Sequence, residues 1–129
     1  MATGGVENSP GEGCILSIRP GVAVVGQAPE GLKVDVRVSL DDKFVREWTV
    51  EYSPGGKPSP ADYDGIPIRP GRHILRVESR RMKEWVERKL PVPSSLWLDI
   101  TFIHVEPGHE RSSEHGFKIS VQDHPTYFR

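Results

Sequence analysis

The residues best suited to chemistry are the eight arginines and lysines between residues 69 and 89, which only three glutamates oppose. The whole chain has a net charge of −1, so the remainder of it is acidic. The densest part holds three basic residues around a methionine, with a tryptophan close behind. Arginine and tryptophan are favoured at the centres of protein interfaces. We therefore predict that this segment binds a protein partner of acidic character. The predicted partner-binding residues are Arg80, Arg81, Met82, Lys83 and Trp85.

Two other interpretations of this basic segment stay open. A solvated basic hairpin would need no partner at all. A nucleic-acid platform would combine basic charge with stacked aromatic side chains, but only Trp85 lies within the run. The nearly neutral net charge also predicts no polyanionic partner for the molecule as a whole. We do not expect nucleic-acid binding.

A second group of reactive side chains lies between residues 104 and 115. His104, His109 and His115 alternate there with three glutamates, and imidazole with carboxylate suits zinc and other divalent ions. The spacings of five and six residues fall in a polar connection, however, whereas structural zinc ligands are closely spaced on rigid supports. A solvated strand connection is therefore favoured, and no metal or other cofactor is predicted. A sandwich that binds a metal ion or a carbohydrate is the alternative function.

Catalytic signatures are missing from the sequence. It holds no G-x-S-x-G elbow, no phosphate-binding G-x-x-x-x-G-K-[ST] loop, no H-E-x-x-H and no C-x-x-C. Cys14 has no adjacent base that would make it a nucleophile, so we interpret it as a small strand residue. His73 follows a Pro-Gly turn, and we predict that it hydrogen-bonds that turn. The expected role is non-enzymatic.

Length and composition indicate what kind of domain carries these residues. A chain of 129 residues suggests one domain that can bury a core without staples. We predict a disordered tail at 1–13, a single domain at 14–123 and a C-terminal tail at 124–129. No apolar run approaches the roughly 20 residues that span a bilayer. The first residues lack the apolar core of a secretion signal, which predicts a cytoplasmic protein as written and an extracytoplasmic one if a signal was removed.

Alternation of apolar and polar residues predicts the first strands. Residues 33–40, KVDVRVSL, place three valines and a leucine on one face. After a turn at 41–43, residues 44–52 run back as a second strand. Its inward side chains are expected to begin with Phe44, and Arg46 is the one charged residue among them. Residues 14–26 form one bent strand or two, separated at Pro20-Gly21. The proline-rich segment 53–65 is expected to be a long loop with at most a brief edge strand.

The second half of the chain repeats this pattern. Residues 73–79 and 84–92 are predicted strands joined by a bend at 80–83, although helical spacing at 78–90 is a rival interpretation. Residues 95–105 alternate most clearly, and 117–123 close the fold with Phe117, Ile119 and Val121 inward. About seven strands with no dependable helix predict an all-β protein. We expect a two-layer antiparallel β-sandwich of the immunoglobulin-like or transthyretin-like kind.

Three short motifs appear in the order found in one group of bacterial modules. They are Pro29-Glu30-Gly31 before a strand, an LDDK turn after it, and Pro70-Gly71-Arg72-His73 leading into an HxLxV strand. Over roughly residues 28–103 the chain resembles PEGA-type domains and their carboxypeptidase-regulatory-like relatives. The resemblance implies a small accessory β-module for surface or envelope interactions. We expect a protein-interaction or structural module that is part of a larger bacterial assembly. It carries over no catalytic residues.

Overall fold

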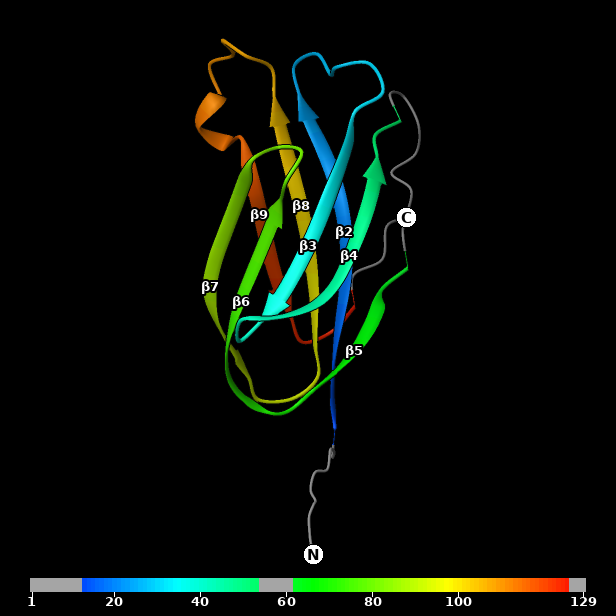
Figure 1. Cartoon of the computed structure of the whole chain (residues 1–129), viewed down its shortest axis with the longest axis vertical. Coiled ribbons are helices and arrows are strands. Elements are labelled where there is room, and N and C mark those ends of the chain that lie inside the picture. Colours follow the sequence, from blue (N-terminus) through cyan, green and yellow to red (C-terminus); the bar gives the residue numbers. More distant parts are fainter. Residues whose placement is uncertain (1–12, 54–61, 126–129) are drawn as a thin grey trace, which may run out of the picture.

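The computed structural model describes residues 13–53 and 62–125, which form strands and one short 3-10 helix (Figure 1). The strands are β2 (Cys14–Val25), β3 (Lys33–Leu40), β4 (Lys43–Glu51), β5 (Asp64–Ile68), β6 (Gly71–Ser79), β7 (Glu84–Val92), β8 (Leu96–Val105) and β9 (Gly116–Gln122), and the helix is η1 (Ser112–Glu114). The predicted terminal tails fall mostly outside the described residues, as does 54–61 of the predicted loop. Among the described residues, no helix has the length and apolarity needed to cross a membrane.

The eight strands form two four-stranded sheets that pack as two layers (Figure 1). One sheet has the order β5-β2-β8-β9 and the other has the order β4-β3-β6-β7. The predicted all-β sandwich is confirmed. Antiparallel pairing holds throughout the second sheet, which we call the antiparallel sheet. In the first sheet β2 runs parallel to β8, so the expectation of a wholly antiparallel sandwich was wrong, and we call this layer the mixed sheet.

The core lies between the sheets and follows the alternation of the strands. In β8, four residues in phase are buried, and three of them, Leu98, Ile100 and Phe102, are fully enclosed. The three valines of β3 are also fully buried, as predicted. Successive side chains of a strand point to opposite faces, so one apolar phase per strand fills the space between the layers. The alternate residues of each strand point to the outer face of its sheet, where polar side chains can lie.

β2 is one continuous strand of 12 residues that passes through Pro20 and Gly21. Its antiparallel pairing with β5 ends at Ile18, whereas its parallel pairing with β8 continues to Val25. Pro20 therefore lies beyond the part of β2 that is flanked on both sides. Proline is tolerated where a strand has a free edge, because no ladder donor is lost there. This explains why the Pro-Gly pair does not divide the strand.

The β3–β4 hairpin is confirmed, with a two-residue turn at Asp41 and Asp42, whose φ angles are 52° and 67°. Two left-handed residues form the type of turn that matches strand twist. The register shifts between Val38 and Ser39. This bulge changes the phase of β4, and Phe44 is 53% exposed instead of inward as predicted.

Arg46, the exception in the predicted inward phase of β4, has a specific partner. Its guanidinium forms an ion pair with Asp64, and the Trp48 indole N–H donates to the same carboxylate at 3.2 Å. Asp64 is the first residue of β5, which belongs to the mixed sheet. The contact therefore joins the two layers along the side where β4 and β5 are the edge strands.

The strands β5, β6, β7 and β9 can be compared with those predicted for the second half of the chain. β6 and β7 pair over nine residues, so the strand interpretation is confirmed and the rival helix was wrong. β5 is an edge strand that begins just inside the segment predicted as a loop. On β9, Phe117 and Ile119 pack against the core. Val121 shares this inward phase and pairs with buried Leu98, but it is 37% exposed because it lies near the end of an edge strand.

Candidate functional site

The predicted partner-binding residues lie on the turn between β6 and β7 and at the start of β7. This turn stands at the same end of the sandwich as the connection from β8 to β9 (Figure 1). Arg80, Arg81 and Lys83 are exposed. Met82 is half-buried and packs against the hydrophobic core. Its side chain therefore holds the turn to the sandwich, and the other predicted residues supply the accessible surface.

A carboxylate on the neighbouring strand fixes the backbone of this turn. Asp35 of β3 accepts a hydrogen bond from the Ser79 hydroxyl at 2.6 Å and bonds from the Arg80 and Arg81 amides at 2.9 and 3.1 Å. The Met82 amide in turn donates to the Ser79 hydroxyl oxygen at 3.1 Å. The arginines thus extend from a turn whose own polar groups are already bonded. We call residues 80–83 the anchored turn.

Burial and hydrogen bonding act in opposite directions on Asp35. Burial raises the pKa of the Asp35 carboxyl, because it disfavours the charged form. The hydrogen bonds from the Ser79 hydroxyl and from two backbone amides of the anchored turn favour the carboxylate, and together they prevail. The net pKa of Asp35 therefore lies below its ordinary value. An ionised carboxylate is what the converging donors require.

Trp85 lies on the outer face of the antiparallel sheet and is 60% exposed. The Arg76 guanidinium carbon lies 4.3 Å from the centre of its ring, and Arg76 Nε also contacts Glu78 at 3.4 Å. A cation over an aromatic ring is attracted to the π face, so Arg76 orients the indole. Sequence reasoning did not connect these two residues, although both occur in the basic segment.

A second arginine–aromatic pair occupies the other side of the same face. The Arg37 guanidinium carbon lies 4.3 Å from the ring centre of Phe44, and Arg37 Nη1 contacts Glu47 at 3.2 Å. Sequence reasoning missed this pair because it placed Phe44 in the core. The outer face of the antiparallel sheet therefore carries two exposed aromatic rings, each with an arginine over it.

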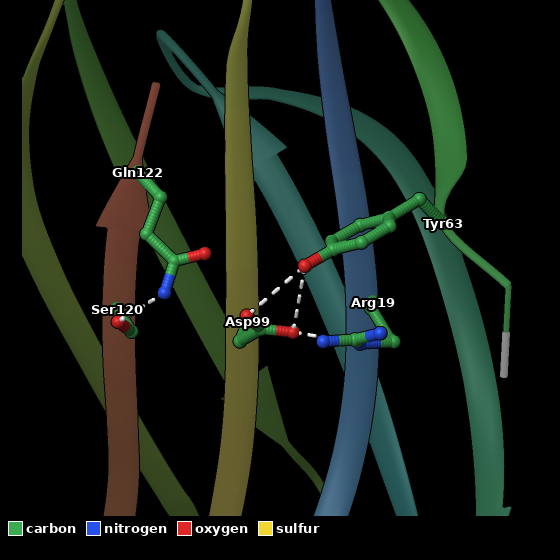
Figure 2. Close-up of polar contacts among 5 residues, drawn as sticks. All are labelled: Arg19, Tyr63, Asp99, Ser120 and Gln122. Atoms are coloured by element: carbon green, nitrogen blue, oxygen red, sulfur yellow. Dashed lines mark hydrogen bonds and ion pairs between the residues drawn. The ribbon is translucent and has the colours of Figure 1, made fainter. Parts of the chain in front are cut away.

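Basic and acidic groups also meet on the outer face of the mixed sheet, where Figure 2 shows Arg19, Tyr63 and Asp99 close together. Arg19 is only 7% exposed and its Nε donates to Asp99 at 2.8 Å. The Tyr63 hydroxyl donates to the same carboxylate at 3.1 Å, and its ring lies under the Arg19 guanidinium at 4.3 Å. This cluster fastens the chain just before β5 to β2 and β8. Beside it, Gln122 Nε2 donates to the Ser120 hydroxyl at 3.4 Å.

His73 hydrogen-bonds the turn that precedes it, as predicted. Its Nε2 lies 2.7 Å from the Arg69 carbonyl oxygen, and its Nδ1 lies 2.6 Å from Asp41 Oδ2. Both partners are acceptors, so both bonds form only when the ring carries two protons. Burial lowers the pKa of His73, but the bonds to Asp41 and to the Arg69 carbonyl raise it more, and the net pKa is above its ordinary value.

The three histidines that the alternative metal-binding interpretation would use are only partly brought together. The ring centres of His104 and His115 are 5.4 Å apart, and His115 Nδ1 accepts a hydrogen bond from the Val105 amide. His109 instead accepts from the Arg111 amide within the connection. Among residues 13–53 and 62–125, no group of three or more histidine, cysteine or acidic side chains is placed to hold a metal ion. Cys14 is a half-buried residue of β2, as interpreted.

Comparison of the chain with protein-family models, with curated proteins and with solved structures finds no match. The geometry of the surfaces described above is therefore the basis for a functional assignment.

Proposed function

We propose that this chain is a non-enzymatic protein-binding module, which recognises an acidic protein surface through the anchored turn and Trp85. The observation that supports the proposal best is the pairing of a highly exposed tryptophan with a turn that presents exposed arginines. An exposed indole on a sheet offers a large apolar area, and arginine offers bidentate bonds to carboxylates. The resemblance to accessory β-modules of bacterial assemblies implies the same class of role.

The hydrogen bonds under the turn support this assignment in energetic terms. Binding loses part of its energy when side chains and loops must become ordered at the interface. Here Asp35 already accepts bonds from two amides of the anchored turn, and Arg76 already lies over the Trp85 ring. The ordering cost that remains on binding is mainly that of the arginine side chains. A preorganised basic surface of this kind suits a carboxylate-rich partner.

The test compares two double variants of similar chemistry on the same sheet. Trp85→Ala with Arg81→Glu removes the proposed binding surface, and Phe44→Ala with Arg37→Glu removes the second arginine–aromatic pair as the control. Each tagged protein is incubated with an extract of native host cells, and bound proteins are quantified by mass spectrometry. We expect the wild type and the control to retain the same acidic protein, and the first variant to lose it at least about tenfold, as 1.4 kcal/mol would give.

Thermal unfolding of all three proteins accompanies this experiment, because a misfolded variant would also lose partners. Raising the salt concentration should weaken capture, since the proposed contacts are between exposed charges. An identical set of bound proteins for the wild type and the Trp85–Arg81 variant, with both folded, would refute the proposal.

A further inference from the structure

An apolar groove lies at the end of the sandwich opposite the anchored turn. It has a volume of about 620 Å³ and lies between the edge strands β7 and β9. Its apolar side chains come from the end of β7, the start of β8 and the end of β9. The main ones are Leu90, Pro91, Val92, Pro93, Leu96 and Val121. Partly exposed Val121 marks where the groove opens to solvent.

The edge strands of the described chain differ in how well they are protected against pairing with another strand. The edges are β5 and β9 in the mixed sheet, and β4 and β7 in the antiparallel sheet. Pro67 in β5 and Pro91 in β7 each remove a backbone donor, which is a common protection of sheet edges. β4 contains the bulge opposite Val38 and Ser39, and bulges also disfavour strand addition.

β9 has neither of these protections. Its sequence, GFKISVQ, contains no proline, and its pairing with β8 runs without a register shift from Gly116 to Gln122. The side of β9 that faces away from β8 therefore presents backbone groups in regular strand geometry. An extended peptide can pair with such an edge through main-chain hydrogen bonds, while alternate side chains enter pockets beside it.

The charges around the groove indicate what kind of peptide would fit. Arg72 and Arg88 line the groove, and Arg88 Nη1 reaches across to the Ile119 carbonyl of β9 at 3.4 Å. Lys118 is exposed on β9 itself. Lys118 alternates with Phe117 and Ile119, which pack against the core, so it points to the outer face of the mixed sheet. On an added strand whose apolar side chains enter the groove, the alternate side chains point to that same outer face, where carboxylates would meet Lys118.

We infer that the free edge of β9 binds an extended segment of another protein in which apolar and acidic residues alternate. The segment adds a strand to the mixed sheet, its apolar side chains enter the groove, and its carboxylates face Lys118 on the outer face of that sheet. The groove is at the opposite end of the molecule from the anchored turn. The inference does not depend on the proposed function, and its test can fail while the proposed function holds.

The test uses an acetylated seven-residue peptide in which valine alternates with glutamate, and a fluorescent label reports binding. A peptide with lysine in place of glutamate tests the charges. A third peptide with methylated backbone nitrogens tests the strand pairing, because it cannot donate main-chain hydrogen bonds. We expect both control peptides to bind at least about tenfold more weakly, and amide exchange in β9 to slow only with the valine–glutamate peptide.

Three variants locate the site on the protein. Val121→Asp places a charge in the groove, and Lys118→Glu reverses the charge that the peptide carboxylates would face. Both side chains are exposed, so we expect each protein to fold and each to bind about tenfold more weakly. Arg81→Glu on the anchored turn is the control and should bind as the wild type does. Equal binding of the methylated peptide, unchanged binding by both the Val121 and the Lys118 variant, or a dimer in sedimentation that the Val121 variant abolishes would each overturn the inference.

Discussion

Asp35 and Ser79, which are 44 positions apart in the sequence, share a hydrogen bond of 2.6 Å under the turn that carries the proposed binding arginines. Both side chains are buried. The carboxylate also accepts bonds from the two arginine amides, so a single side chain of β3 determines the shape of a turn between β6 and β7.

Replacing Asp35 with asparagine should destabilise the protein. The variant retains the size of the side chain, but its amide group places donors where the turn also has donors. Leaving buried donors unsatisfied costs about 1–3 kcal/mol, and we expect a loss of that order in the free energy of unfolding measured with urea. Asp42→Asn is the matched control, because Asp42 is exposed and asparagine tolerates its left-handed conformation; a similar loss in both variants would contradict the assigned role.

The lowered pKa of Asp35 adds an acid dependence to this contribution. The pKa is lower in the folded state than in the unfolded state, so the stabilisation is complete above the ordinary pKa of 3.8 and is lost as the pH falls through the folded value. Between neutral and strongly acidic pH, the Asp35→Asn protein should therefore lose less stability than the wild type. An equal loss of stability in both proteins as the pH falls would contradict the lowered pKa of Asp35.

Loss of the second ring proton of His73 should make the protein less stable at alkaline pH. Its pKa is raised above 6.5 in the folded state, so its stabilisation is complete below the unfolded value and is lost as the pH rises through the folded one. We expect the melting temperature to fall between pH 6 and 9, and this fall to shrink in His73→Gln. His124→Gln, at an exposed site near the end of the described chain, should keep the slope of the wild type.

Two phenylalanines allow the core and the surface to be compared directly. Phe102 is fully buried, and its ring packs edge-on against the rings of Phe117 and His115. The distances between ring centres are 5.1 Å to Phe117 and 5.3 Å to His115. Phe102→Ala should cost about 3–5 kcal/mol of unfolding free energy through the cavity it leaves. Phe44→Ala removes the same side chain from an exposed site and should cost about 1 kcal/mol or less, mainly its contact with Arg37. Equal losses in urea titrations would show that Phe44 is not a surface residue.

The Arg19–Asp99 pair should contribute more to stability than the surface pair Arg111–Glu114. Arg19 is almost completely buried, and removing the carboxylate beside a buried charge costs about 3–5 kcal/mol when the site is dry. Asp99 itself is partly exposed, so we expect about 2–4 kcal/mol for Asp99→Asn. Glu114→Gln, at a pair that is about half exposed, should cost clearly less, because solvent screens the pair; calorimetric unfolding of both variants provides the comparison.

Much of the fold could be predicted because alternation of apolar residues is a local property of each strand. The segments 33–40 and 96–105 show it plainly, and both are strands. Residues 84–92 show it less clearly, since helical spacing there supported a rival interpretation, but they too form a strand. The parallel pairing of β2 with β8 could not be predicted this way, because alternation identifies faces and does not identify neighbours. The outward position of Phe44 depends on a bulge that leaves no mark in the composition of β4.

The candidate site was predictable only in part for a similar reason. The alternating segments on either side predicted the turn at 80–83 correctly. It could not show that Met82 packs inward or that Asp35 lies under the turn, since both follow from the packing of β3 beside β6. Arg76 and Trp85 are nine positions apart, and only the pairing of β6 with β7 brings them together.

The parallel alignment of β2 with β8 also determines the order in which the fold can assemble. Leu16 pairs with Leu96, and the last pair joins Val25 to Val105, so the central ladder of the mixed sheet closes a loop of most of the chain. During synthesis, β2 emerges from the ribosome early and must wait for β8. Folds dominated by such distant pairings reach the native state in milliseconds to seconds, and stopped-flow refolding should place this protein at the slow end of that range. Until then β2 is an exposed apolar strand, which makes it the segment where a chaperone would be most useful.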